Sequence, residues 1–447
     1  MAETYDQLTL LSDLIDDAIK EGADAADAVV FDASSVSVSC RMGELEKLER
    51  SESNDLGLRV FVGKQQAIVS STDFEPSTLR EVVSRTVAMA KAAPEDPYCG
   101  LANAEQLVTD PPVLEICDSE EPSNETLIDS ARTAEDAARA VTGVTNSEGA
   151  ETGWSRARIA IATSNGFART YETSSHSLAA SVLAGEGTDM ERDYDYASSV
   201  YHADMEDPAK IGCSAGERAV KRLNARKVET QQVPVVYDPR VSGGIVRHYA
   251  SGINGSSISR GTSFLKDSRG EKVFADGINI VDDPHRNRGL RSKPFDAEGL
   301  PNARKNLADN GVIQTWVLDL ASARQLNLES TGNAARGTAS PPSPAVTNLY
   351  MEAGNVSPEA LISDIKSGFY VTELIGMGIN MVTGDYSRGA TGFWIENGEI
   401  AYPVTEMTVA GNLKDMFANL TPADDLEFRF GTDAPTLRID GMTVAGS

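Results

Sequence analysis

The stretch RHYASGI contains His248, the residue of this chain best suited to metal chemistry. A two-histidine zinc helix presents its ligands about one turn apart on one face, with a glutamate beside the metal-bound water as general base. Here the residue after His248 is Tyr249, and Gly252 and Ile253 lie one turn further on. Tyrosine, with an ordinary pKa of about 10, cannot serve as that base. The local pattern therefore predicts no metal site in this helix.

Two other patterns have short spacings that could support chemistry. Ser-x-x-Lys occurs at Ser263 and again at Ser363, but a serine acyl enzyme also needs a Lys-Thr-Gly strand, which the chain lacks. The segment IVDDPHRNRG offers Asp282, Asp283 and His285 to a divalent ion. Asp-Asp-Pro is also an ordinary turn opener, and we favour the turn. We therefore predict no catalytic residue and no bound cofactor in this chain.

A glycine-dense segment near the C-terminus, TGDYSRGATGFWIENGEI, carries Asp385, Ser387 and Arg388. We interpret it as strands joined by hairpin turns. The pair Asn397-Gly398 predicts a type I′ turn, because both residues tolerate positive φ.

Hydrophobic periodicity predicts the elements that would position these residues. The first half alternates helices with β segments, whereas from about residue 232 short strands punctuated by glycine dominate. The predicted fold is α+β with two domains: residues 1–228 with helices and an antiparallel sheet, and residues 229–447 rich in β structure. We expect helices at 6–22, 76–92, 121–141, 207–224 and 239–253, short strands across 27–72, and hairpins across 155–204.

Composition excludes several classes of function. The 447 residues include 40 basic and 67 acidic ones, a formal charge of −27, which disfavours direct binding to nucleic acid. No apolar run reaches the ~18 residues of a membrane span, and the acidic N-terminus does not resemble a signal peptide. The four cysteines form no CxxC pair. These features favour a cytoplasmic protein.

Longer stretches of the chain resemble the TldD/PmbA peptidase family, and specifically its PmbA (TldE) branch. The likeness covers essentially the whole chain and is strongest after residue 232. It is carried by SRGTSFLKDSRGEKVF, NIVDDPHRNRGLRSKPFDAEGLP, LESTGNAARG, GFYVTELIGMGIN, TGDYSRGATGFWIENGEIAYPVTEMTVAGNL and PTLRIDGMTVAG.

The resemblance implies what the helix at RHYASGI has lost. In the catalytic TldD branch the corresponding helix carries His-Glu-x-x-x-His. This chain keeps the first histidine as His248, but Tyr249 replaces the glutamate and Ile253 the second histidine. The family's third zinc ligand is a cysteine upstream of the PTLRID-like strand, and no cysteine follows Cys213 here. The three helix positions therefore look like a degenerate zinc site.

The resemblance further implies a non-catalytic subunit of a heterodimeric metallopeptidase. A TldD-type partner would hold the zinc, and the pair would cleave unfolded peptides such as leader segments, in peptide maturation, or small antitoxins. The glycine-rich segment 376–398 is our candidate for a wall of the peptide-binding space, with close backbone packing as the equal alternative. Two other functions stay open: an independent peptidase acting as a homodimer, and a peptide-binding scaffold without proteolytic role.

Overall fold

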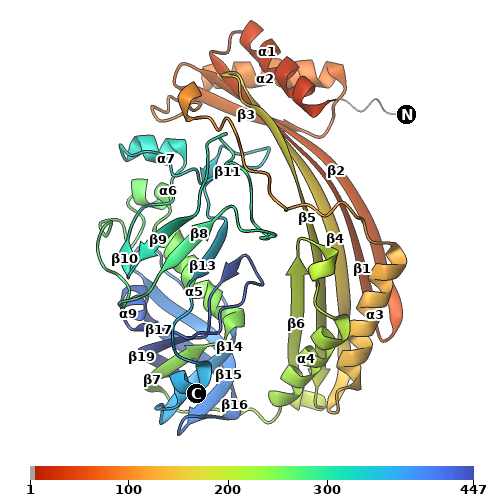
Figure 1. Cartoon of the computed structure of the whole chain (residues 1–447), viewed down its shortest axis with the longest axis vertical. Helices are drawn as coiled ribbons and strands as arrows, with labels where there is room; N and C mark the ends of the chain where they lie inside the picture. Colours follow the sequence, from red (N-terminus) through yellow and green to blue (C-terminus); the bar gives the residue numbers. More distant parts are fainter. Residues whose placement is uncertain (1–5, 447) are drawn as a thin grey trace.

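The computed structural model describes residues 6–446, and Figure 1 shows the first half of the chain as a long curved sheet with helices. The six strands follow the order β3-β2-β1-β4-β5-β6, and every neighbouring pair is antiparallel. The helices are α1 (Gln7–Lys20), α2 (Pro76–Ala92), α3 (Asn124–Ala140) and α4 (Pro208–Lys221), with 3-10 turns at Ala104–Gln106, Gly187–Asp189 and His202–Asp204. The strands are β1 (Ala25–Arg41), β2 (Glu44–Val62), β3 (Gln65–Ser71), β4 (Val144–Thr163), β5 (Ala168–Ala184) and β6 (Glu191–Ser199).

The expected short strands are wrong for this sheet. Its strands β1, β2, β4 and β5 are each 17–20 residues long, and β4 begins at Val144, well before the expected residue 155. The apolar pattern fades over residues 44–53, which suggested a strand end. Backbone pairing continues through them because neighbouring strands supply the hydrogen bonds whatever the side chains are.

All four helices of this part lie on one face of the curved sheet. Even-numbered residues of β1 lie in two successive apolar cores. Ala28 and Val30 pack in the first core with α1 and α2, and Val36 and Val38 pack in the second with α3 and α4. Side chains alternate between the faces of a strand, so odd-numbered residues face the other way. One of them, Val29, packs with Phe295 of the second half of the chain. The two halves therefore share a small apolar core.

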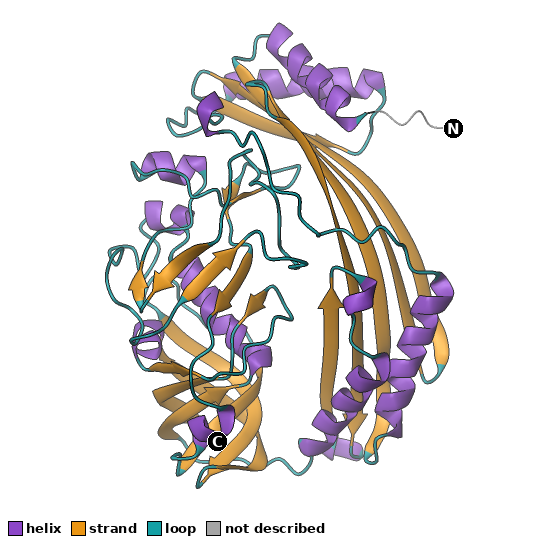
Figure 2. Cartoon of the chain, viewed as in Figure 1, coloured by secondary structure: helices purple, strands orange, loops and turns teal. Residues whose placement is uncertain are grey.

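The second half of the chain is β-rich and encloses a large core (Figure 2). Strands β16-β15-β14-β7-β19 form a closed barrel because β19 also pairs with β16, and β17 adds to β19. A second sheet has the order β10-β9-β8-β13-β18. The strands are β7 (Gln231–Tyr237), β8 (Ile280–Asp283), β9 (Lys305–Asp309), β10 (Val312–Ile313), β11 (Ala334–Ala335), β12 (Ser343–Pro344), β13 (Asn348–Met351), β14 (Ser367–Ile375), β15 (Asp385–Glu396), β16 (Glu399–Asn412), β17 (Leu420–Pro422), β18 (Thr432–Asp433) and β19 (Leu437–Ala445). The helices are α5 (Pro239–Gly252), α6 (Gly255–Ser259), α7 (Leu320–Gln325), α8 (Pro358–Ile362) and α9 (Leu413–Ala418).

The structure confirms the α+β class and the five expected helices to within a few residues at each end. It also confirms the turn at Asn397 and Gly398, whose φ values of 52° and 85° suit type I′ between β15 and β16. Most strands of the second half are short, as expected, but β15 and β16 have 12 and 14 residues. No helix among residues 6–446 is long and apolar enough to cross a membrane.

Candidate functional site

Helix α5, which carries the RHYASGI stretch, begins directly after barrel strand β7. Asp238 caps its first turn by accepting a hydrogen bond from the Arg240 backbone N–H at 2.9 Å, and Pro239 takes the first helical position. Gly243 lets the helix approach β18 closely, since a Cβ there would lie 2.5 Å from the Thr432 carbonyl oxygen. The region upstream of PTLRID therefore lies beside α5.

His248 is half-buried on α5, next to the barrel. Its ring lies 6.0 Å from the ring of Tyr386 on β15, in an edge-to-face arrangement. Burial, with a further contribution from the positive charges of Arg388 and Arg247, lowers the pKa of His248 to about 4. The imidazole is therefore neutral at physiological pH.

The other two helix positions compared with the zinc motif, Tyr249 and Ile253, belong to the apolar core. Tyr249 is fully buried, donates its hydroxyl to the Leu307 carbonyl oxygen at 2.9 Å, and packs edge-to-face on Phe274. Burial raises its pKa, so the hydroxyl keeps its proton. Ile253 is also fully buried in that core.

These residues do not fit a zinc ion. A zinc site needs several nitrogen, sulfur or oxygen ligands, and His248 supplies one. The nearby Asp433 of β18 already accepts the backbone N–H groups of Arg429 and Phe430, at 2.9 and 2.8 Å. Throughout residues 6–446, no three His, Cys, Asp or Glu side chains converge in a way that could hold a metal ion.

In the acidic segment 282–285, strand β8 ends at Asp283 and the chain turns at Pro284 and His285, so the expected turn begins after the two aspartates. Asp283 accepts the backbone N–H of His285 at 3.0 Å, the hydrogen bond of an Asx turn. Asp282 instead faces the interior and accepts hydrogen bonds from Asn333 and Thr347. The two carboxylates therefore serve different structural roles.

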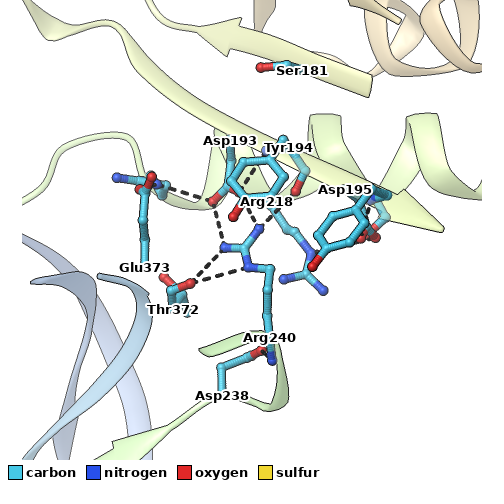
Figure 3. Close-up of polar contacts among 12 residues, drawn as sticks. Ser181, Asp193, Tyr194, Asp195, Arg218, Asp238, Arg240, Thr372 and Glu373 are labelled. Atoms are coloured by element: carbon cyan, nitrogen blue, oxygen red, sulfur yellow. Dashed lines mark hydrogen bonds and ion pairs between the residues drawn. The ribbon is translucent and has the colours of Figure 1, made fainter. Parts of the chain in front are cut away.

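A second polar cluster, not singled out by sequence, joins the two halves of the chain (Figure 3). The Arg240 guanidinium donates to the carboxylate of Asp193 on β6 at 2.7 Å and to the Thr372 carbonyl oxygen of β14 at 3.0 Å. Arg222, after α4, bonds Glu373 of β14 at 2.7 Å. Burial opposes ionisation of Asp193, but the hydrogen bond and charge of Arg240, the backbone N–H of Tyr194 and the charge of Arg222 together outweigh it and lower its pKa. We call these residues the junction cluster.

Side chains of Arg240 and Arg429 also close the free edge of β6, which within residues 6–446 pairs only with β5. Arg240 and Arg429 donate to the carbonyl oxygens of Tyr194 and Tyr196, at 2.8 and 3.0 Å. The N–H groups of the same two tyrosines donate to the preceding aspartates, at 2.8 and 2.9 Å. An unpaired strand edge normally invites another strand. Over these residues the edge of β6 is occupied by side chains instead.

A cavity of about 640 Å³ lies beside the junction cluster, between α4 and the barrel. Its polar wall comes from α4 and includes Glu217, Arg218 and Lys221, while Phe393 and Tyr402 form part of the apolar wall. The sequence holds one signal for the cluster: Asp193 and Asp195 alternate in ERDYDYASS, so both carboxylates point to one face of a strand. The arginines that meet them are not predictable from that spacing.

Family models match three successive parts of the chain. They are described as PmbA/TldA metallopeptidase domain 1, central domain and C-terminal domain, and they cover residues 26–90, 117–223 and 230–446. The chain is 36% identical over 426 residues to the metalloprotease PmbA of Escherichia coli O157:H7, which covers 95% of this chain and 93% of the relative.

Solved structures match the whole fold. A crystal structure from Bacteroides thetaiotaomicron, described as a candidate modulator of DNA gyrase, is 26% identical, has a TM-score of 0.91, and covers 99% of this chain and 100% of the other. TldE from Thermococcus kodakarensis has a TM-score of 0.86 at 20% identity, with 98% and 100% covered, and it supports the fold alone.

Proposed function

Because this chain belongs to the PmbA/TldA metallopeptidase family, we propose that it is the TldE-like, non-catalytic subunit of a heterodimeric peptidase. A TldD-type partner would supply the zinc and the base, and the pair would cleave unfolded peptides. The observation that carries the proposal is the state of α5. Two of the positions that bear catalytic residues in the TldD branch, Tyr249 and Ile253, are fully buried core residues here.

The chemistry of α5 supports a role without hydrolysis. Peptide hydrolysis at a zinc site needs a polarised water and a base to remove its proton. Neutral His248 alone does not hold such an ion, and Tyr249 is a buried hydrogen-bond donor. Forming a zinc site at these positions would require core residues to move. The packing around α5 therefore supports a structural role for this helix.

The experiment compares this chain, a TldD-type partner and their mixture, each incubated with an unstructured peptide, with and without chelator. We expect cleavage only in the mixture, and loss of that cleavage on adding chelator or on replacing the glutamate of the partner's zinc motif. The purified chain alone should contain no stoichiometric zinc by elemental analysis. Chelator-sensitive cleavage by this chain alone would contradict the proposal, and so would full activity of the partner without it.

A further inference from the structure

The cavity beside the junction cluster has two walls of different chemistry. Its volume of about 640 Å³ lies within the ~300–1,000 Å³ range of small-ligand sites, which are often found between domains. Helix α4 of the first half forms one wall, and strands β14, β15 and β16 of the second half form the other. Side chains from both halves of the chain therefore face one common space.

The barrel wall is apolar, and we call Tyr370, Phe393 and Pro403 its shelf. Tyr370 of β14 pairs directly with Phe393 of β15, which in turn pairs directly with Pro403 of β16. Directly opposed residues of neighbouring strands project from the same face of a sheet. The three side chains therefore stand side by side, and all three line the cavity. Ile400 of β16, which is 48% exposed, extends the shelf toward solvent.

A glycine on β15 brings the shelf residues together. A Cβ at Gly392 would lie 1.9 Å from the Tyr370 carbonyl oxygen, so any larger residue there would push β14 away from β15. The close backbone packing that we considered for the segment 376–398 thus occurs at Gly392. The next residue of the same segment, Phe393, lines the cavity.

The α4 wall is polar. Ser214, Glu217, Arg218 and Lys221 line the cavity, and their spacing of three or four residues places them on one face of the helix. The opposite face of α4 packs in an apolar core against the curved sheet. The wall carries hydroxyl, carboxylate, guanidinium and ammonium groups, so it offers both hydrogen-bond donors and acceptors.

Polar groups between the two walls are already engaged within the chain (Figure 3). Asp193 accepts from Arg240 at 2.7 Å. Asp238 accepts from the Tyr370 hydroxyl at 3.0 Å and from the Arg240 backbone N–H at 2.9 Å. The shelf and the α4 wall therefore remain as the surfaces that a ligand can contact.

The two walls together indicate one class of ligand. A large apolar side chain, and an aromatic ring above all, matches a shelf that contains Tyr370 and Phe393. The amide groups of a peptide backbone each donate and accept, so they match a polar wall that holds groups of both kinds. An extended peptide can present a side chain to one wall and its backbone to the other, because its amides are not bonded to one another.

We propose that this cavity binds a large apolar residue of an unfolded peptide, an aromatic one best, with the adjoining backbone against α4. This inference rests on the proposed role in peptide processing. It adds a preference for one class of substrate, and it assigns that preference to the non-catalytic subunit.

The test measures fluorescence anisotropy of labelled, unstructured octapeptides with the full chain. The peptides are acetylated and amidated, and they differ only in a central phenylalanine, leucine or serine. The phenylalanine peptide should bind roughly tenfold or more tightly than the serine peptide, because a ring gains from burial on the shelf and a hydroxyl does not. The leucine peptide should lie between them. Equal affinity for the phenylalanine and serine peptides, or no measurable binding of the former, would overturn the inference.

Variants of the shelf show where the peptide binds. Phe393→Ala should weaken binding of the phenylalanine peptide roughly tenfold and leave the serine peptide unchanged. Ile400→Ser, at the exposed end of the shelf, should act in the same direction by about threefold. Phe428→Ala is the matched control and should alter neither affinity, because Phe428 is 40% exposed in the same half of the chain and lies outside the cavity lining.

Circular dichroism and melting curves check that the variants fold. Unchanged affinity for the phenylalanine peptide in a folded Phe393→Ala chain would overturn the inference. If Phe393→Ala does not fold, the exposed Ile400→Ser decides in the same way. Co-purification of the shelf variants with a TldD-type subunit tests the proposed function separately, since that pairing does not depend on which peptide the cavity prefers.

Discussion

Histidine 248 illustrates how burial decides the chemistry of a single side chain. An exposed histidine titrates near pH 6.5, but burial and two neighbouring arginines lower the pKa of His248 to about 4. Between these values the unfolded chain binds a proton that the folded chain does not. The folded state therefore loses stability as pH falls from about 6.5 toward 4 and has its full stability above that range.

We expect His248→Gln to remove part of this pH dependence. The wild-type free energy of unfolding should fall by on the order of 2 kcal/mol more than that of the variant between pH 7 and pH 4.5. Urea unfolding at several pH values measures the difference. Parallel stability curves for the two chains would show that His248 has an ordinary pKa in the folded state.

The burial of Tyr249 and Ile253 predicts that zinc-site residues substituted at these two positions would destabilise the fold. Substituting Tyr249→Glu together with Ile253→His would place a carboxylate and an imidazole in a core where both native side chains are fully buried. We expect a loss of about 3–5 kcal/mol in the free energy of unfolding, from lost packing and buried polar groups without partners. The doubly substituted chain should also bind no stoichiometric zinc, because the third ligand is still absent. A stable variant with one zinc per chain would contradict this account of α5.

At the scale of elements, glycine spacing sets how closely helices approach their neighbours. In α4, Gly212 faces α3, and a Cβ there would lie 1.9 Å from the Ala134 carbonyl oxygen. In α5, Gly244 has no atom within 4 Å of the same position. Identical substitutions in these two helices should therefore have opposite effects.

Gly212→Ala should destabilise the protein by about 2 kcal/mol or more, because α3 and α4 must separate. Gly244→Ala should stabilise it by about 0.5–1 kcal/mol, since alanine loses less conformational freedom in a helix. Thermal melts of both variants beside the wild type give the comparison. Equal melting temperatures for the two variants would mean that the α3–α4 contact is looser than described.

At the scale of the whole molecule, the junction cluster couples the curved sheet to the barrel. Asp193 is 2% exposed and bonds Arg240 at 2.7 Å, so removing Arg240 leaves the longer 3.4 Å pair with Arg222 to compensate its charge. Removing one partner of such a buried ion pair lowers the free energy of unfolding by about 3–5 kcal/mol. Exposed ion pairs contribute about 1 kcal/mol or less.

We expect Arg240→Gln to lower the free energy of unfolding by about 3 kcal/mol, and Asp193→Asn by a similar amount. The double variant should lose less than the sum, with a coupling of about 1–3 kcal/mol in a double-mutant cycle. Arg192→Gln, which breaks an exposed 2.6 Å pair with Glu148, is the matched control and should cost about 1 kcal/mol or less. Limited proteolysis of residues 222–230 reports the same coupling, and an additive cycle would show that the pair does not join the two halves.

Local patterns determined much of this protein without its structure. The apolar period of 3.6 residues located five helices, and the Asn397-Gly398 pair specified its turn, because both features depend on neighbours along the chain. The residues of RHYASGI offer His248 no second histidine and no carboxylate one turn along its helix. The family followed from stretches spread over the whole chain.

Only the tertiary structure decided which distant groups meet. Asp193 and Arg240 are separated by a helix and a strand, and the Tyr386 ring reaches His248 from β15. Strand β2 is also longer than expected, because hydrogen bonds to β1 hold residues 44–53, whose side chains follow no apolar pattern. Contacts of this kind depend on how sheets and helices pack in space, and sequence spacing along one element does not contain that information.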